Sequence, residues 1–195
     1  MARTATVARK TGETDIRITV DLDGTGESRI STGVGFFDHM LTALSRHSLI
    51  DMDIAVTGDT WVDDHHTVED TGIALGQAIR EALGDKRGIR RFGDALVPLD
   101  EALIMAAVDI SGRGELFWEV PIGPDKVGTF DTELGHEFFC GFARDAGMTL
   151  HLREVCGTNA HHILEATFKA CARALRVAVE PDPRVTGIPS TKGSL

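Results

Sequence analysis

The chain has 195 residues, of which 42% are hydrophobic, which is enough for one compact domain or for two small halves that share a core. Its formal net charge of −10 argues against nucleic acid or an anionic membrane as the main partner, but it permits a small anionic substrate where basic residues converge. Three cysteines without CxxC spacing favour reduced thiols. There is no apolar secretion segment and no run approaching about 18 apolar residues, so we expect a soluble, cytoplasmic protein.

Hydrophobic periodicity predicts five elements in the first half of the chain. Ile16 to Leu22 alternates between apolar and polar residues, which indicates a half-buried strand, and glycines follow it at a turn. A helix is expected where apolar side chains recur three and four residues apart. The predicted order is strands over 16–22 and 28–32, a helix over 36–46, a strand over 52–56 and a long helix over 65–84.

The second half repeats this order. The pattern predicts strands over 102–110 and 115–120, a helix over 132–146, a strand over 149–155 and a helix over 161–179. An α+β fold with duplicated β-β-α-β-α halves follows, with the halves at 1–92 and 93–195 forming one compact unit. The proline-containing tail over 182–195 cannot continue a helix, and we interpret it as a functional arm or a frayed end.

Both halves carry the pattern His-His-x-x-Glu at the front of a predicted helix: His65, His66 and Glu69 in the first, and His161, His162 and Glu165 in the second. On a helix, the glutamate shares a face with either histidine, whereas adjacent residues point roughly 100° apart. One doublet is therefore better suited to supplying two different metal ions than to chelating one. A solvated helix surface is the plain alternative, but such a surface has no need of the duplication. We predict two metal sites, each built from both halves.

A fourth ligand for each site is expected from the shorter helices. His39 is the natural addition in the first half. In the second half, aligning Met40, Leu41 and Leu44 with three phenylalanines sets His39 against Glu137, whereas aligning His39 with His136 places Met40 against Glu137. We favour Glu137 over His136, because carboxylate is also a competent ligand for Mn²⁺ or Fe²⁺.

Several basic or hydroxyl residues are candidates for binding a phosphate. Planar guanidinium groups suit bidentate phosphate recognition, and a run of small residues offers backbone N–H groups and hydroxyls. Each cation taken alone is equally well explained as a solvated surface charge. The candidates are Arg91, Arg113, Lys169, and the Ser190 and Lys192 of the run 189–193.

Together these patterns resemble the imidazoleglycerol-phosphate dehydratase family along the whole chain. The matching runs are RKTGET at 9–14, TGVGFFDHML at 32–41, DDHHTVED at 63–70, DISGR at 109–113, NAHHILEA at 159–166 and PSTKG at 189–193. The resemblance implies a duplicated α+β fold with helices packed between two mixed sheets. It implies dehydration of imidazole glycerol phosphate to imidazole acetol phosphate in histidine biosynthesis. It also implies two Mn²⁺ ions per active site, completed by neighbouring subunits of a 24-subunit homo-oligomer.

The same resemblance assigns roles to residues. It implies that Arg91, Arg113, Lys169, Ser190 and Lys192 bind the substrate phosphate and that Glu13 contacts the substrate. The carbon that loses a proton has no neighbouring carbonyl, so we expect cations to favour loss of the imidazole N–H first. The electron-rich ring can then expel the hydroxyl. Glu13, Glu69 and Glu165 are the candidate catalytic acids or bases, and the sequence does not choose among them.

Two other classes of protein have to be weighed. A dimetal phosphohydrolase uses similar sites to bring water onto phosphorus, but it usually has Asp-rich bridging ligands, and this set is dominated by histidine. A non-enzymatic assembly stapled by metal ions is the second alternative. Structural metal sites tend to be closed by protein ligands, and the clustered basic residues would then have no purpose.

Overall fold

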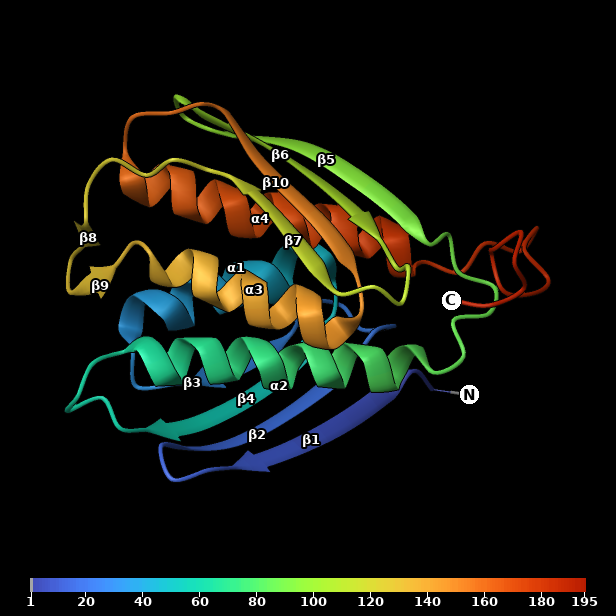
Figure 1. The fold of residues 1–195 in the computed structure, drawn as a ribbon, viewed down its shortest axis with the longest axis horizontal. Helices are drawn as coiled ribbons and strands as arrows, with labels where there is room; N and C mark the ends of the chain where they lie inside the picture. The colour runs from blue at the N-terminus through green and yellow to red at the C-terminus, as the bar shows by residue number, and fades with distance from the viewer. Residues whose placement is uncertain (1) are drawn as a thin grey trace.

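Four helices lie between two mixed four-stranded sheets in the part of the chain that the computed structural model describes, residues 2–195 (Figure 1). This confirms the predicted α+β class and the placement of the helices. None of these helices has the length and apolar character needed to cross a membrane.

The first sheet has the strand order β1-β2-β4-β3, in which β3 runs parallel to β4 and the other pairs are antiparallel. Its central strands show the predicted alternation, with Ile16, Ile18 and Val20 buried against the helices. The elements of this half are β1 (Thr4–Lys10), β2 (Thr14–Asp21), β3 (Ser28–Ser31), α1 (Gly35–Ser48), β4 (Asp51–Gly58) and α2 (His65–Leu83).

The second sheet repeats both the order and the directions, as β5-β6-β10-β7. A small hairpin, β8–β9, is inserted before the helix α3. The elements are β5 (Phe92–Leu99), β6 (Ala102–Asp109), β7 (Glu115–Glu119), β8 (Lys126–Val127), β9 (Phe130–Asp131), α3 (Leu134–Ala146), β10 (Thr149–Cys156) and α4 (Ala160–Val179).

Each half begins with an edge strand that the sequence analysis did not predict. In β1 only Val7 is buried, and in β5 only Gly93 is buried. An edge strand that buries so little apolar surface carries a weak alternating pattern, so hydrophobic periodicity misses it. Apart from the inserted β8–β9 hairpin, the halves are therefore β-β-β-α-β-α, one strand longer than predicted.

The helices pair across the halves. Helix α1 packs against α4, and α2 packs against α3 (Figure 1). The second pair is very close: a Cβ atom added at Gly72 or Gly76 would lie 2.4 Å from the Phe138 carbonyl oxygen or 2.6 Å from that of Phe142. Only glycine lets the two backbones approach this far.

A cluster of phenylalanines joins the halves into one core. The ring centroid of Phe138 lies 5.4 Å from that of Phe37, 5.0 Å from that of Phe139 and 5.1 Å from that of Phe168. All four rings are buried, and they come from α1, α3 and α4. Aromatic pairs at these separations add to the free energy gained from area burial alone.

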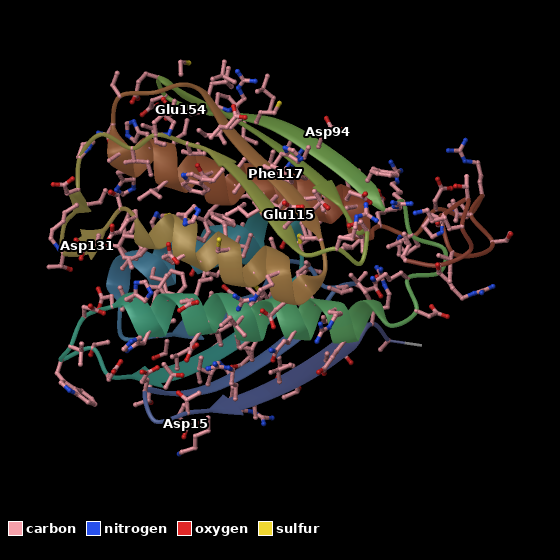
Figure 2. All side chains as sticks on the ribbon, viewed as in Figure 1. Asp15, Asp94, Glu115, Phe117, Asp131 and Glu154 are labelled. Carbon is pink, nitrogen blue, oxygen red and sulfur yellow. The ribbon has the colours of Figure 1, made fainter. Side chains whose placement is uncertain are left out.

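The outer faces of the two sheets differ in character, and Figure 2 shows Asp15 and Asp94 at the two opposite surfaces. The first sheet presents mostly polar or charged side chains, such as Arg17 and Asp53. The second sheet exposes large apolar side chains: Phe92, Leu96, Phe117 and Val155, which are 58%, 60%, 41% and 55% exposed. We call this set the apolar sheet face.

Candidate metal centre and active site

Three predicted ligands meet where α1 packs against α4. His39, His161 and Glu165 each offer an atom, and these atoms lie within 4.8 Å of one another. The side chain of Asn159 caps α4 by accepting hydrogen bonds from the backbone N–H groups of His161 and His162. This fixes the helix start and places His161 one turn from Glu165, with Nε2 and Oε2 3.1 Å apart. Among residues 2–195, this is the one cluster of three or more candidate ligands.

Glu165 is held in its charged form. Burial alone raises the pKa of this carboxyl, but the Lys169 ammonium, 2.7 Å away, together with His39 and His161, outweighs burial and lowers the pKa below its usual value. Glu165 is therefore an anion at neutral pH, as a metal ligand must be. Lys169 faces this carboxylate.

In the first half, His65 and Glu69 share a face of α2, with His65 Nε2 3.7 Å from Glu69 Oε2. Helix α3 packs against α2 at this point, where a Cβ atom added at Gly141 would lie 3.1 Å from the Glu69 carbonyl oxygen, and Glu137 lies one turn before Gly141. His136 Nδ1 lies 2.9 Å from Glu137 Oε1. The His136 ring also packs edge-on against Trp118 of β7, with ring centroids 5.6 Å apart, and the choice between Glu137 and His136 as the fourth ligand stays a prediction.

The second histidine of each doublet faces away from the first and lies between two carboxylates. His66 Nδ1 is 3.0 Å from Asp59, and its Nε2 is 3.7 Å from Glu13. In the other half, His162 pairs in the same way, with Glu101 2.7 Å from Nδ1 and Asp100 3.6 Å from Nε2.

Sequence reasoning identified Glu13 but missed Asp59, Asp100 and Glu101. Glu13 lies in the turn between β1 and β2, and Asp100 with Glu101 lies in the corresponding turn between β5 and β6. Because the two halves repeat, the candidate Glu13 in one turn could have directed attention to the corresponding turn, where Asp100 and Glu101 lie.

The carboxylates change the titration of both histidines. The hydrogen bond to Asp59 is the largest cause raising the pKa of His66, and the hydrogen bond to Glu101 does the same for His162. In return, the His162 bond and backbone hydrogen bonds lower the pKa of Glu101 to about 2. Each pair is a charge-assisted contact with a defined ring orientation.

Four of the predicted phosphate binders line one pocket at the far end of α4. Arg91 has a left-handed backbone conformation, with φ of 72°, and its guanidinium makes a bidentate pair with Asp109 at 2.7 and 3.2 Å. The same guanidinium donates to the Pro189 carbonyl oxygen at 2.9 Å, and this contact holds the C-terminal arm in place. Lys169 is not among the lining residues, which include Arg91, Ser111, Arg113, Ser190, Thr191 and Lys192.

Lys86 is a further cation that sequence reasoning missed. It is 9% exposed, and its ammonium lies 3.5 Å from where a Cβ on Gly112 would be. Burial, then the charges of Arg80 and Arg91, lower the pKa of Lys86. The positive potential at this end of the molecule thus extends below the surface.

The chain is similar to known proteins over its full length. The family model described as imidazoleglycerol-phosphate dehydratase matches residues 32–175. Proteins of that name from Granulibacter bethesdensis and Gluconacetobacter diazotrophicus are 62% and 65% identical, covering 100% of this chain and 100% and 98% of their own. A solved imidazoleglycerol-phosphate dehydratase from Staphylococcus aureus is 40% identical with a TM-score of 0.84, covering 92% of this chain and 99% of its own. One from Pyrococcus furiosus has the same identity and TM-score, covering 97% and 100%.

Proposed function

The chain belongs to the imidazoleglycerol-phosphate dehydratase family, and from that premise we propose how its site carries out the reaction. The protein is a hydro-lyase of histidine biosynthesis that removes water from imidazole glycerol phosphate, giving imidazole acetol phosphate. The observation that carries the proposal is the meeting of His39, His161 and Glu165. An imidazole–carboxylate site of this kind can polarise a substrate that itself carries an imidazole ring.

The donor set fits Mn²⁺, of which we propose two ions per active site. Imidazole and carboxylate together suit Mn²⁺ and Fe²⁺, and thiolate ligands, which favour Zn²⁺ or Cu⁺, are absent from the cluster of three. When bound, the cations favour the deprotonated form of the substrate imidazole. The proposed ligands are His39, His65, His66, Glu69, Glu137 or His136, His161, His162 and Glu165.

We propose that neighbouring subunits complete each site within a 24-subunit homo-oligomer. The first histidine of each doublet faces its glutamate within the chain, whereas His66 and His162 turn their Nε2 atoms toward Glu13 and Asp100, away from that glutamate. Each site within one chain therefore lacks the second histidine of its doublet as a ligand. A second chain that presents its own doublet can supply that imidazole. The apolar sheet face supports association, because exposed apolar patches mark protein–protein contacts.

The protein's own side chains divide the remaining work. Arg91, Arg113, Ser190 and Lys192 hold the substrate phosphate in the pocket beside the C-terminal arm. Lys169 keeps Glu165 charged in this chain, and its contact with the phosphate stays a prediction. Loss of water needs one group to take the C–H proton and one to protonate the departing hydroxyl. Glu13, Glu69 and Glu165 are the candidates, and Glu13 is the most exposed of the three, with a half-exposed side chain.

We also propose a cytoplasmic location, consistent with the biosynthetic role and with the free thiols of Cys140, Cys156 and Cys171.

The decisive experiment measures turnover of imidazole glycerol phosphate by the purified protein, before and after chelation and after Mn²⁺ is restored. We expect keto product that disappears with the chelator and returns with Mn²⁺. Release of inorganic phosphate would instead support a dimetal phosphohydrolase. A metal-loaded oligomer that forms neither product would support a stapled, non-enzymatic assembly.

A further inference from the structure

We propose that Asp59 and Glu101 are positioning residues for the second histidine of each doublet. Each fixes the ring and the tautomer of its histidine, so that Nε2 is the atom offered to a cation. This inference rests on the proposed function, since it concerns how His66 and His162 become ligands.

In the second half, the contact is part of a larger clamp made by Glu101. Oε2 lies 2.7 Å from His162 Nδ1. Oε1 accepts from the backbone N–H groups of Thr158 and Asn159, at 3.2 and 2.8 Å, and from the Thr158 hydroxyl at 3.2 Å. The two oxygens therefore have separate tasks: one holds the loop that leads into α4, and the other holds the imidazole.

In the first half, the contact is simpler. Asp59 is 7% exposed, and both of its carboxylate oxygens face His66 Nδ1, at 3.0 and 3.2 Å. Its backbone N–H donates to the Glu13 carbonyl oxygen at 3.1 Å, which fixes the residue just after β4. Among residues 2–195, no other donor is hydrogen-bonded to the Asp59 carboxylate.

The two carboxylates come from positions that the duplication does not relate. Asp59 follows the end of β4, and the equivalent place after β10 holds Gly157 and Thr158. Glu101 comes from the turn between β5 and β6 instead. The same contact to Nδ1 has therefore been built from two different segments, so an inherited contact does not explain it, whereas a shared requirement on the histidine does.

That requirement follows from the chemistry of imidazole. A neutral ring carries one proton, and a carboxylate on Nδ1 keeps the proton there, which leaves the Nε2 lone pair for a metal ion. Partners of this kind fix ring orientation and raise ligand basicity. A carboxylate that merely neutralises a protonated histidine could face either ring nitrogen, so it would not need to contact Nδ1 in both halves.

Because the two Glu101 oxygens have separate tasks, replacing each carboxylate by its amide tests whether it fixes the histidine tautomer. In Glu101→Gln, the amide oxygen is needed for the three loop donors, so the NH₂ group faces Nδ1 and favours the tautomer with a proton on Nε2. In Asp59→Asn, the side chain is free to present its oxygen to His66. The proposal thus predicts opposite results for two changes of the same chemical kind.

The test titrates metal-free, full-length protein with Mn²⁺ in a calorimeter, alongside Glu119→Gln as a control, since Glu119 pairs with the exposed Arg153 on the outer sheet and not with a doublet histidine in the described part of the chain. We expect Glu101→Gln to weaken one of the two Mn²⁺ sites by about 10- to 100-fold. Asp59→Asn should stay within a few-fold of wild type, and Asp59→Ala should weaken binding as Glu101→Gln does. Unfolding temperatures of the metal-free proteins show whether the fold has changed.

Wild-type affinity in Glu101→Gln would overturn the proposal. So would equal weakening in both amide variants, or weakening that appears only together with a lower unfolding temperature of the metal-free protein. Failure of the proposed function looks different: the wild-type protein itself would bind no Mn²⁺ or form no keto product. The positioning role and the reaction are therefore judged by separate readouts.

Discussion

The two halves of this molecule share a scaffold but not their surfaces. Both use the same strand order, and both place a histidine doublet at the start of the long helix. The β8–β9 hairpin lies in the second half, and so do most residues of the apolar sheet face and of the pocket around Arg113, to which the first half adds Phe92 and Arg91 at its end. The difference teaches that the duplication preserved the scaffold and the placement of the histidine doublets, while the basic pocket and the exposed apolar surface are features of mainly one copy.

The largest effect should come from the glutamates of the two doublets. We expect Glu165→Gln and Glu69→Gln each to lower turnover by about 10²- to 10⁴-fold, with the larger loss for Glu165, which is more buried and contacts two histidines. Product formation with excess Mn²⁺ measures this. Glu81→Gln, at an exposed position on α2, is the control. Near-normal turnover in one variant alone would show that the two halves do not contribute equally to the chemistry.

Core substitutions compare the short helices of the two halves. Phe138→Ala should lower the free energy of unfolding by about 3–5 kcal/mol, because its ring packs against aromatic rings from both halves. Met40→Ala, at the aligned position in α1, should cost about 2–4 kcal/mol, because the side chain is equally buried but flexible. Urea unfolding at one fixed protein concentration measures both. A smaller loss for Phe138 than for Met40 would place the centre of the core in the first half.

The outer faces offer a third comparison. Leu96→Lys removes an apolar contact worth about 1.5–3 kcal/mol if the apolar sheet face is covered, so it should shift the assembly toward smaller species. Ala55→Lys, on the outer face of the first sheet, should leave the mass unchanged. Light scattering after gel filtration distinguishes these outcomes. An intact assembly in Leu96→Lys would mean that copies meet elsewhere.

The smallest effect concerns the ion pair between Arg3 and Asp23, which ties the edge strand β1 to the turn after β2. The Arg3 hydrogen bond lowers the pKa of Asp23 below 3.8. A lowered folded-state pKa contributes stability above the unfolded value near 3.8, and that contribution is lost as pH falls through the folded value. Because Asp23 is half exposed, we expect Arg3→Ala to cost at most about 1 kcal/mol near pH 7 and less near pH 3. An equal cost at both pH values would show that the Arg3 bond to the Val179 carbonyl oxygen dominates.

Much of the fold was predictable because the central strands and the long helices bury one clear face. The doublets were also found, since a repeated short pattern is visible without a structure. The missed features are edge strands with few buried residues and contacts between distant segments. Glu101 meets His162 across 61 positions of the chain, and no local pattern marks that meeting. The choice between Glu137 and His136 depends on helix rotation, which periodicity fixes only to within about one residue.

The exchange of helix partners between the halves has a consequence for how such a chain could arise. The short helix of each half packs against the long helix of the other half. A half-length protein with this topology would therefore lack a partner for its short helix, and alone it could not form a cluster like that of His39, His161 and Glu165. Two copies, each lending a helix to the other, would form both pairs at once. Joining them in one gene makes an encounter between molecules into an intramolecular step, and it frees each copy to specialise.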